Sequence, residues 1–245
     1  MTVATAIQPT LQSDLLDTLR HGTPTDGLVL YLPGLDYGNQ YTGTILDYSG
    51  RGNHGTITGA TGIRLPSGLW ALNFTQADGN YVTVNNASSI TFTTENWTLF
   101  FWIWRRAVNT QSYFFDKGVA NTDGWYCRIQ AENYMNCIIN QAGANQQTKS
   151  TANPFAVQTW SLIAFTRSGT KGYWFVNGVD VTDVQPALTD PATNNRDLLI
   201  GIDQAKGWAN SMGGYMWGQR LLSGVAHTAT QQLAIYQRER HLFGV

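Results

Sequence analysis

From Leu28 onward, the sequence is divided into short runs rich in β-branched and aromatic residues, and Gly, Asn or Asp separates one run from the next. The runs cover residues 28–32, 69–74, 80–84, 97–104, 112–118, 125–129, 135–140, 160–167, 172–181, 197–202 and 215–222. β-Branched and aromatic side chains favour strands, and Gly and Asn favour the turns between them. Many short strands at this spacing predict an all-β sandwich or barrel.

The chain is predicted to be one β domain that follows an N-terminal extension. The chain has 245 residues, and single all-β domains of this length are common. Folding at this size buries about 70% of the surface of the unfolded chain, which is enough for a core without disulfides or metals. In residues 1–27, leucines at helical spacing predict a short amphipathic helix that ends at Gly22. We therefore interpret residues 1–27 as an extension or attachment arm and residues 28–245 as the domain.

The charge of the chain is low and balanced. Fifteen Lys and Arg residues oppose sixteen Asp and Glu residues, and the formal net charge is -1. Binding to nucleic acid or to an anionic membrane surface needs clustered positive charge. The sequence also lacks a secretion signal and any apolar run of the roughly eighteen residues that span a membrane. We expect no nucleic-acid partner, no membrane segment and synthesis in the cytoplasm.

One hairpin can be placed by its turn residues. The Asn-Gly pair at 177–178 readily takes positive φ angles. It predicts a two-residue type I′ turn that pairs Val176 with Val179 and Trp174 with Val181.

A second hairpin brings the two cysteines of the chain together. A three-residue loop at 131–133, with Asn133 in the left-handed conformation, would place Cys127 directly opposite Cys137. Because no secretion signal is present, two reduced thiols are favoured over a disulfide, which is the alternative.

Two further elements can be assigned from apolar patterns. Residues 97–104 are apolar on both faces of the expected strand, which predicts a central strand covered on both sides. Near the C-terminus, Ala226, Ala229, Leu233 and Tyr236 recur at helical spacing. They predict a short helix that lies against the sandwich.

Recognisable catalytic patterns are absent from the sequence. Glutamate occurs only at isolated positions, so no strand presents the paired carboxylates that glycan hydrolysis uses. We find no Gly-x-Ser-x-Gly, phosphate-loop or His-Glu-x-x-His pattern. These observations favour a protein that is not an enzyme. A glycan hydrolase is the alternative, with Asp116 and Asp123 as the acids that would converge in a cleft.

Several segments, in order along the chain, carry a resemblance to a known superfamily. The main ones are LDYSGRGNHGTITG at 46–59, LWALNFTQADGNYVTV at 69–84 and WTLFFWIW at 97–104. With later matches such as FDKG at 115–118, the sequence resembles the laminin-G-like, concanavalin A-like lectin and glucanase superfamily over residues 28–240. The resemblance implies a jelly-roll sandwich of two curved antiparallel sheets. It also implies that a concave face and rim loops bind glycans or proteins, often near a Ca²⁺ ion.

The loop at 47–55 is the candidate calcium site. It offers the Asp47 carboxylate and the Asn53 amide, and hard cations such as Ca²⁺ prefer oxygen ligands. The alternative is structural, with Asp47 closing a turn that the glycines of the loop permit. A single carboxylate favours the turn. In addition, the chain has Met212-Gly213-Gly214 where many relatives place an Asp. No cofactor is required, and Ca²⁺ is the ion that could bind.

Aromatic residues in polar loops are the candidate ligand contacts. They are Tyr37, Tyr41, Trp125 and Trp208, and Asn210 lies beside the last of them. Tyr and Trp rings can stack on the apolar face of a sugar or anchor a protein interface. The alternative is that these rings close the ends of the sandwich without a ligand. Other tryptophans are expected in the core, namely Trp70, Trp97, Trp102, Trp160 and Trp174.

The sequence favours a non-catalytic recognition or assembly domain on the surface of a phage-type virion. Such a protein is made in the host cytoplasm and displayed without secretion. Residues 1–27 would bind other virion chains or further copies of this chain in a homo-oligomer, and the rim loops would face host glycans. A free-standing carbohydrate-binding lectin is the first alternative, and the hydrolase is the second.

Overall fold

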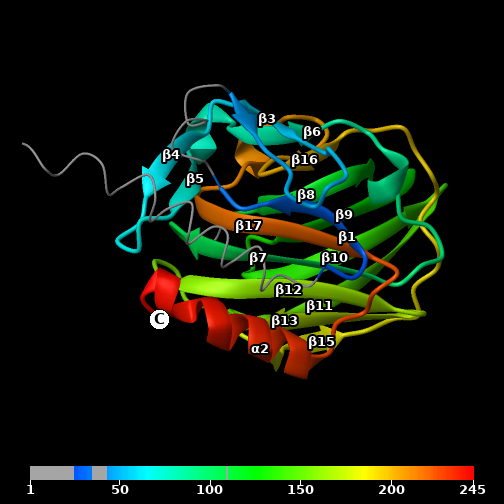
Figure 1. Ribbon diagram of the computed structural model, residues 1–245. Helices are drawn as coiled ribbons and strands as arrows, with labels where there is room; N and C mark the ends of the chain where they lie inside the picture. The colour runs from blue at the N-terminus through cyan, green and yellow to red at the C-terminus, as the bar shows by residue number, and fades with distance from the viewer. Residues whose placement is uncertain (1–24, 35–42, 109) are drawn as a thin grey trace, which may run out of the picture.

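The protein is described by a computed structural model that covers residues 25–34, 43–108 and 110–245 (Figure 1). Two sheets lie face to face, and every strand pairing between described residues is antiparallel. This arrangement confirms the predicted all-β jelly-roll sandwich. Residues 1–24 are outside the described residues, so the attachment arm stays a prediction.

The first sheet is eight-stranded. Its order is β14 (Val179–Asp180), β13 (Lys171–Val176), β12 (Trp160–Ser168), β7 (Trp97–Arg105), β17 (Gly214–Ser223), β5 (Trp70–Phe74) and β4 (Thr61–Arg64), and β1 (Leu28–Leu32) also pairs with β17.

The second sheet is nine-stranded. Its order is β15 (Thr182–Val184), β11 (Ala144–Ala152), β10 (Tyr134–Gln141), β9 (Asp123–Ile129), β8 (Ser112–Val119), β16 (Leu198–Ile200), β6 (Tyr81–Val84), β3 (Gly55–Thr58) and β2 (Thr44–Ile45). Short 3-10 helices lie between strands: η1 (Gln76–Asp78), η2 (Ser88–Ile90) and η3 (Trp208–Asn210).

The main core lies between the two sheets. Alternate side chains of β7, including Trp97 and Phe101, meet Trp125 and Cys127 of β9 there. The rings of Trp97 and Trp125 have centroids 4.8 Å apart. Large aromatic side chains therefore fill the space between the layers, and their burial supplies much of the hydrophobic stabilisation.

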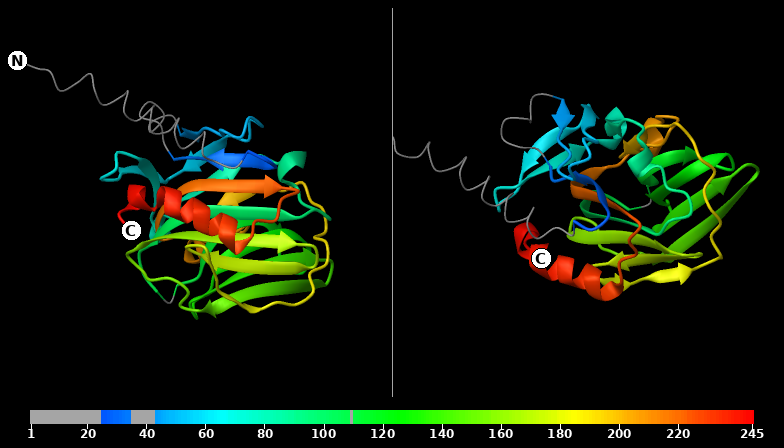
Figure 2. Two further views of the ribbon diagram at one scale, coloured as in Figure 1. Left: turned by 60° about the horizontal axis from the view of Figure 1, so that its bottom comes forward. Right: turned by 45° about the vertical axis from the view of Figure 1, so that its right-hand side comes forward.

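A second apolar layer covers the outer face of the eight-stranded sheet. The helix α2 (Ala229–Glu239) and the helix η4 (Arg240–Phe243) lie across this face, as both views in Figure 2 show. Phe243 stacks on Trp102 of β7, with ring centroids 4.1 Å apart. Both faces of β7 are thus covered, and β7 lies between β12 and β17. The prediction of a central strand is confirmed.

Both predicted hairpins are present. Val176 pairs with Val179, and the amide of Val181 donates to the carbonyl oxygen of Trp174 at 2.9 Å. Asn177 and Gly178 have φ angles of 52° and 83°, which fit a type I′ turn.

The cysteine hairpin has the predicted register. Cys127 pairs with Cys137, and Asn133 has a φ of 60°. The two sulfur atoms are 2.7 Å apart, and both residues are free cysteines with no exposed surface. Burial raises the pKa of the Cys127 thiol well above its usual value, which keeps it protonated and unreactive.

The C-terminal helix is present, and Ala229 and Tyr236 pack against the outer core of the sheet as predicted, but the prediction was wrong for Leu233. Leu233 is 41% exposed, whereas Gln232, Ile235 and Glu239 are buried. Thr228 and Gln231 form a capping box that starts the helix after Ala226. The helix turns a carboxylate inward because that group pairs with a buried arginine of the sheet. None of the described helices is long and apolar enough to span a membrane.

Candidate functional site

The Asp47 carboxylate organises the loop between β2 and β3. Its Oδ1 atom accepts hydrogen bonds from the amides of Tyr31 and Ser49, both at 2.9 Å. Its Oδ2 atom accepts from the Ser49 hydroxyl at 2.7 Å and from the Asn53 amide at 2.8 Å. Nδ1 of His54 accepts from the Asp47 amide at 2.9 Å. This geometry is that of a closed turn.

The Asn53 side chain is also engaged within the protein. Its Nδ2 atom donates to the carbonyl oxygen of Val29 at 2.7 Å and to the Ser89 hydroxyl at 3.0 Å. Among the described residues, no group of three or more His, Cys, Asp or Glu side chains could hold a metal ion. A calcium ion at Asp47 would have to replace donors that already satisfy both carboxylate oxygens. The turn interpretation stays a prediction, which melting with and without Ca²⁺ can test.

Trp125 does not lie where the loop interpretation placed it. It is a core residue of β9 with 1% of its surface exposed, and it packs against Trp97 and Phe92. The prediction that its ring contacts a ligand at the surface was wrong. The apolar alternation of β9 takes this side chain into the space between the sheets.

The other predicted ligand contacts lie in two places. Tyr37 and Tyr41 are outside the described residues. Trp208 begins η3, and Asn210 ends it. The Asn210 amide is used within the protein, because Nδ2 donates to Oδ2 of Asp203 at 2.6 Å and Oδ1 accepts from Gln111 at 2.9 Å. Asn210 therefore fixes the loop that carries Trp208.

The two acids of the hydrolase alternative are both held by other groups. Asp123 forms a bidentate ion pair with Arg196, at 2.8 and 3.0 Å. Asp116 accepts from the amides of Gly118 and Gln204, at 2.9 and 3.0 Å. Burial, aided by the charge of Asp203, raises the pKa of Asp116 to about 7 against the hydrogen bonds that lower it.

The register separates these two acids along the sheet. Asp116 pairs with Tyr126, and Asp123 pairs with Val119. Three residue steps along a strand correspond to about 10 Å. Paired carboxylates of retaining glycosidases are about 5 Å apart, and those of inverting enzymes about 6.5 to 9.5 Å. The raised pKa of Asp116 meets one criterion for an acid catalyst, but Asp123 is not its partner.

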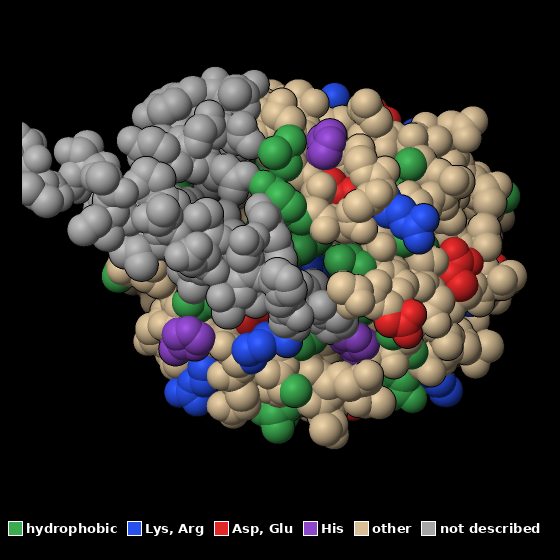
Figure 3. Space-filling model, viewed as in Figure 1, with side chains coloured by type: hydrophobic (Ala, Val, Ile, Leu, Met, Phe, Trp, Pro, Cys, Tyr) green, Lys and Arg blue, Asp and Glu red, His purple; other side chains and the backbone are tan. Residues whose placement is uncertain are grey.

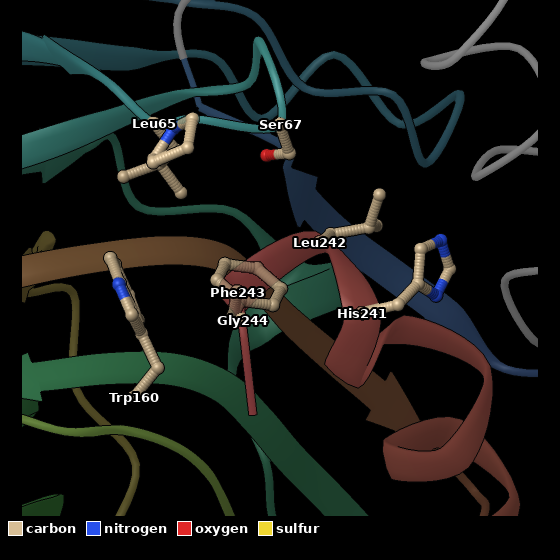
Figure 4. Close-up of a pocket in the computed structure, with 8 residues that line it drawn as sticks. Leu65, Ser67, Trp160, His241, Leu242, Phe243 and Gly244 are labelled. Atoms are coloured by element: carbon tan, nitrogen blue, oxygen red, sulfur yellow. The ribbon is translucent and has the colours of Figure 1, made fainter.

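A pocket opens beside the C-terminus, between the outer face of the eight-stranded sheet and the turn that joins β4 to β5. It has a volume of about 320 Å³ and is lined by Leu65, Pro66, Ser67, Trp160, His241, Leu242, Phe243 and Gly244. We call it the aromatic pocket. In Figure 4, Trp160 extends from the sheet toward Leu65, while Phe243 and Leu242 come from the C-terminal helix. The walls of the pocket are mainly apolar.

Ser67 supplies a polar group to the aromatic pocket. Its hydroxyl oxygen is buried and has no hydrogen-bond partner among the described residues. A buried hydroxyl without a partner costs about 1 to 3 kcal/mol. A polar atom of a bound molecule could supply the missing hydrogen bond.

Next to the pocket, three aromatic side chains form a row across three strands. Trp160 of β12 pairs with Trp104 of β7, and Trp104 pairs with Tyr215 of β17. All three project from the outer face, and Trp104 and Tyr215 are only half-buried. The rings of Trp104 and Tyr215 have centroids 4.8 Å apart, and those of Trp160 and Tyr215 are 6.2 Å apart. We call these residues the aromatic row.

Polar groups border the aromatic row. The guanidinium of Arg106 is 5.9 Å from the ring centroid of Trp104 and 5.5 Å from that of Tyr215. Arg106 also donates to Oδ1 of Asn73 at 3.2 Å, and Nδ2 of Asn73 donates to Thr61 at 3.2 Å. The site thus combines aromatic rings with an exposed cation and amide and hydroxyl groups. These groups can bind a molecule with an apolar face and a polar edge.

Sequence reasoning missed this site for a definable reason. Residues 97–104 were correctly predicted as a strand, but Trp160 was expected simply as a core residue. Trp104, Trp160 and Tyr215 are far apart in sequence and meet only because of the order β12-β7-β17. A sandwich pattern does not specify that order.

The charged side chains of the described residues are scattered over the face seen in Figure 3. Figure 3 shows Lys and Arg side chains separated from one another, with Asp and Glu between them. This distribution agrees with the balanced charge of the sequence.

Comparisons with known proteins agree with the fold. A family model described as the concanavalin A-like lectin/glucanases superfamily matches residues 76–229. No curated protein gives a significant match.

Solved structures of toxin binding domains are similar to the chain. The binding domain of Paraclostridial Mosquitocidal Protein 1 has a TM-score of 0.68 and 14% identity, over 87% of this chain and 52% of that one. The binding domain of Botulinum neurotoxin DC was solved in complex with rat synaptotagmin II and with SialylT. Each of these two structures has a TM-score of 0.63 and 14% identity, over 88% of this chain and 52% of that one. The chain therefore spans about half the length of these proteins.

Proposed function

Because this chain belongs to the concanavalin A-like lectin/glucanase superfamily, we propose that it is a non-catalytic recognition domain that binds a glycan at the aromatic pocket and aromatic row. The observation that carries the proposal is the row of Trp160, Trp104 and Tyr215 beside an open pocket of about 320 Å³. Trp104 and Tyr215 are half-buried, and contiguous aromatic side chains that reach the surface are typical of binding sites.

The chemistry of the site suits a saccharide. The C–H face of a sugar ring can pack on an aromatic ring, while the sugar hydroxyls need hydrogen-bond partners at the edge. Arg106 and Asn73 border the row, and the unpaired hydroxyl of Ser67 lines the pocket. The exposed guanidinium of Arg106 also favours a saccharide that carries a carboxylate or sulfate. The names of the similar toxin structures, which describe binding domains, support a binding role in general.

The absence of catalysis is part of the proposal. The acids named for a hydrolase, Asp116 and Asp123, are held by backbone amides and by Arg196. Neither of them lines the aromatic pocket. Both carboxylates thus hold loops and strands together, which supports binding rather than turnover.

We further propose that the protein is displayed on the surface of a phage-type virion. In this proposal residues 1–27 attach the domain to other virion chains or to further copies of itself, and the aromatic pocket faces the host. The balanced charge and the Asn-, Gln- and Thr-rich β body support a displayed structural protein. A free-standing lectin would bind the same glycan and would not need residues 1–27.

A glycan array with the wild-type protein and Trp104→Ala tests the binding site. We expect the wild type to bind at least one glycan and Trp104→Ala to bind it at least tenfold more weakly by calorimetry. The matched control is Tyr134→Ala, because Tyr134 is a half-buried aromatic residue of the other sheet with Lys149 5.0 Å from its ring. Thermal melting of all three proteins verifies the fold. Failure of the wild type to bind any glycan, or equal binding by Trp104→Ala, contradicts the proposal.

A further inference from the structure

A second groove lies at the other end of α2, between its N-terminus and the strands β12, β13 and β14. Its volume is about 310 Å³, and its lining includes Thr166, Ser168, Tyr173, Phe175, Asp180 and His227. We call it the His227 groove. It shares no residue with the aromatic pocket, so an argument about it does not depend on the function proposed above.

Two aromatic side chains form one wall of the His227 groove. Tyr173 and Phe175 are two residues apart on β13, so both project from the same face of the sheet. Their ring centroids are 6.4 Å apart, and the ring planes differ by only 17°. Tyr173 is half-buried and Phe175 is only 4% exposed, so the Tyr173 ring supplies most of the apolar surface of this wall and Phe175 packs beside it.

His227 is held in a fixed orientation. Its backbone amide donates to Oγ1 of Thr98 at 3.0 Å, and its ring packs on Phe100 with centroids 5.7 Å apart. Nδ1 lies 3.2 Å from Nε2 of Gln232. Because an amide nitrogen can only donate, Nδ1 accepts, and the proton of the neutral ring is on Nε2. His227 therefore has one N–H donor, on the nitrogen that does not face Gln232.

The protonation state of His227 is constant over the physiological range. Burial lowers the pKa of this imidazole to about 4. Its ring is therefore neutral at pH values above about 5, and it acts as a hydrogen-bond donor rather than as a cation.

The interaction with Gln232 carries an energetic cost. Gln232 is fully buried, and its Oε1 atom has no hydrogen-bond partner among the described residues. An unpaired buried carbonyl costs about 1 to 3 kcal/mol. Leucine at this position would avoid that cost while still packing against the sheet. The buried amide is therefore explained better by its role in orienting His227 than by stability.

Asp180 adds a charged acceptor to the groove. Its side chain is exposed, and Oδ1 accepts from the amide of Thr182 at 2.9 Å. Oδ2 has no hydrogen-bond partner among the described residues and can accept from hydroxyl groups. Among the described residues that line the groove, only Asp180 carries a charge. Its negative charge opposes the binding of an anion.

From these observations we propose that the His227 groove is a second saccharide site, and that its ligand is a neutral sugar. The ring of Tyr173, supported by Phe175, packs on the apolar face of the sugar. Asp180 accepts from the sugar hydroxyls, and Nε2 of His227 donates to one of the sugar oxygens. The two sites differ in charge, because Arg106 borders the aromatic row and Asp180 borders the His227 groove. One face of the sheet would then hold two sugars of different character, at the two ends of a helix about 16 Å long.

Saturation-transfer NMR with neutral tetrasaccharides of glucose, galactose and mannose tests this proposal on the full chain. We expect at least one of them to receive saturation from the wild type, and Tyr173→Ala and Asp180→Asn to reduce the transfer at least fivefold. Tyr134→Ala, in the other sheet and outside both pockets, is the control that should leave the transfer unchanged, and Trp104→Ala separates the aromatic row from the His227 groove. His227→Gln, which keeps an N–H donor, should retain more transfer than His227→Ala.

The outcomes separate the two sites. Loss of transfer in Trp104→Ala with full transfer in Tyr173→Ala overturns the second site and leaves the aromatic pocket as the neutral-sugar site. Binding that Tyr173→Ala abolishes and Trp104→Ala does not affect supports the His227 groove, whether or not the aromatic pocket binds a glycan. The absence of transfer to any neutral tetrasaccharide overturns the proposal. Melting temperatures within a few degrees of the wild type verify that the variants are folded.

Discussion

Asp116 is a carboxylic acid that is almost completely removed from solvent on β8. Burial raises its pKa from 3.8 to about 7. Between these values the folded protein binds a proton at Asp116 that the unfolded chain has released. The free energy of unfolding therefore falls as the pH rises from about 4 to about 7, by an amount on the order of 4 kcal/mol from this group.

Asp116→Asn should remove this pH dependence. The amide resembles the protonated acid in being neutral, although it keeps only one acceptor for the amides of Gly118 and Gln204. We expect the wild type to be more stable than the variant at pH 4.5. By pH 8 this advantage in unfolding free energy should be smaller or reversed. Urea unfolding at four pH values measures this difference. His227 contributes in the opposite direction between pH 4 and 6.5, but it is present in both proteins and cancels. Parallel stability curves would contradict the assignment.

The carboxylate of Asp47 has hydrogen-bond donors on both oxygens without a metal ion. Four donors from Tyr31, Ser49 and Asn53 surround its carboxylate. We expect the melting temperature to be the same in millimolar Ca²⁺ and in excess chelator, because a ligand that binds only the folded state must raise stability. Differential scanning calorimetry measures this. An increase of several degrees with Ca²⁺ would establish a calcium site and overturn the turn interpretation.

At the level of elements, a buried ion pair attaches α2 to the sheet. Arg220 of β17 and Glu239 of α2 are both completely buried, with 3.0 Å between Nη2 and Oε1. The indole nitrogen of Trp102 also donates to Glu239, at 2.8 Å. Such a pair stabilises little relative to apolar residues, but the loss of one partner leaves a buried charge without compensation.

Glu239→Ala should therefore lower the free energy of unfolding by about 3 to 5 kcal/mol. The control is Arg238→Ala, because Arg238 contacts the same carboxylate from a position that is 40% exposed and should cost less than about 1 kcal/mol. The double variant Arg220→Met with Glu239→Leu should recover most of the loss. Denaturant unfolding followed by tryptophan fluorescence compares the four proteins. Equal stability of Glu239→Ala and Arg238→Ala would show that the pair does not anchor the helix.

The ion pair also explains which elements could be predicted from the sequence. The hairpins at 177–178 and 131–133 were predicted with the correct register, because local turn residues set the register of a hairpin. The helix and two of its packing residues, Ala229 and Tyr236, were predicted, but Leu233 fits the apolar pattern and is nevertheless exposed. The inward position of Glu239 depends on Arg220, which is nineteen residues away and on another element. Apolar periodicity contains no information about such a partner.

At the level of the whole molecule, the sandwich could be predicted and its binding surface could not. Alternating strands and the order of the family motifs were enough for two antiparallel sheets. The candidate contacts were chosen as aromatic residues in loops, and Trp125 proved to be a core residue. The aromatic row instead comes from strands, where Trp104 and Tyr215 occupy outward positions just beyond the part of the sheet that η4 covers. How far η4 covers the outer face of the sheet depends on how the C-terminal residues pack there, and the strand pattern does not contain this information.

Display on a virion requires that the domain be attached to the particle. A displayed domain must bind neighbouring chains, and residues 1–27 are the part of the sequence that we assign to this role. Deletion of residues 1–24 leaves β1 and its pairing with β17 in place, so the sandwich should melt at nearly the same temperature. We expect the full chain to self-associate in analytical ultracentrifugation and the shortened chain to sediment as a monomer, because the apolar side of the predicted helix is lost with the deletion. A glycan that binds both forms equally would show that recognition and assembly are separate. A full chain that is monomeric at all concentrations would remove the support for assembly through this segment and favour the free-standing lectin.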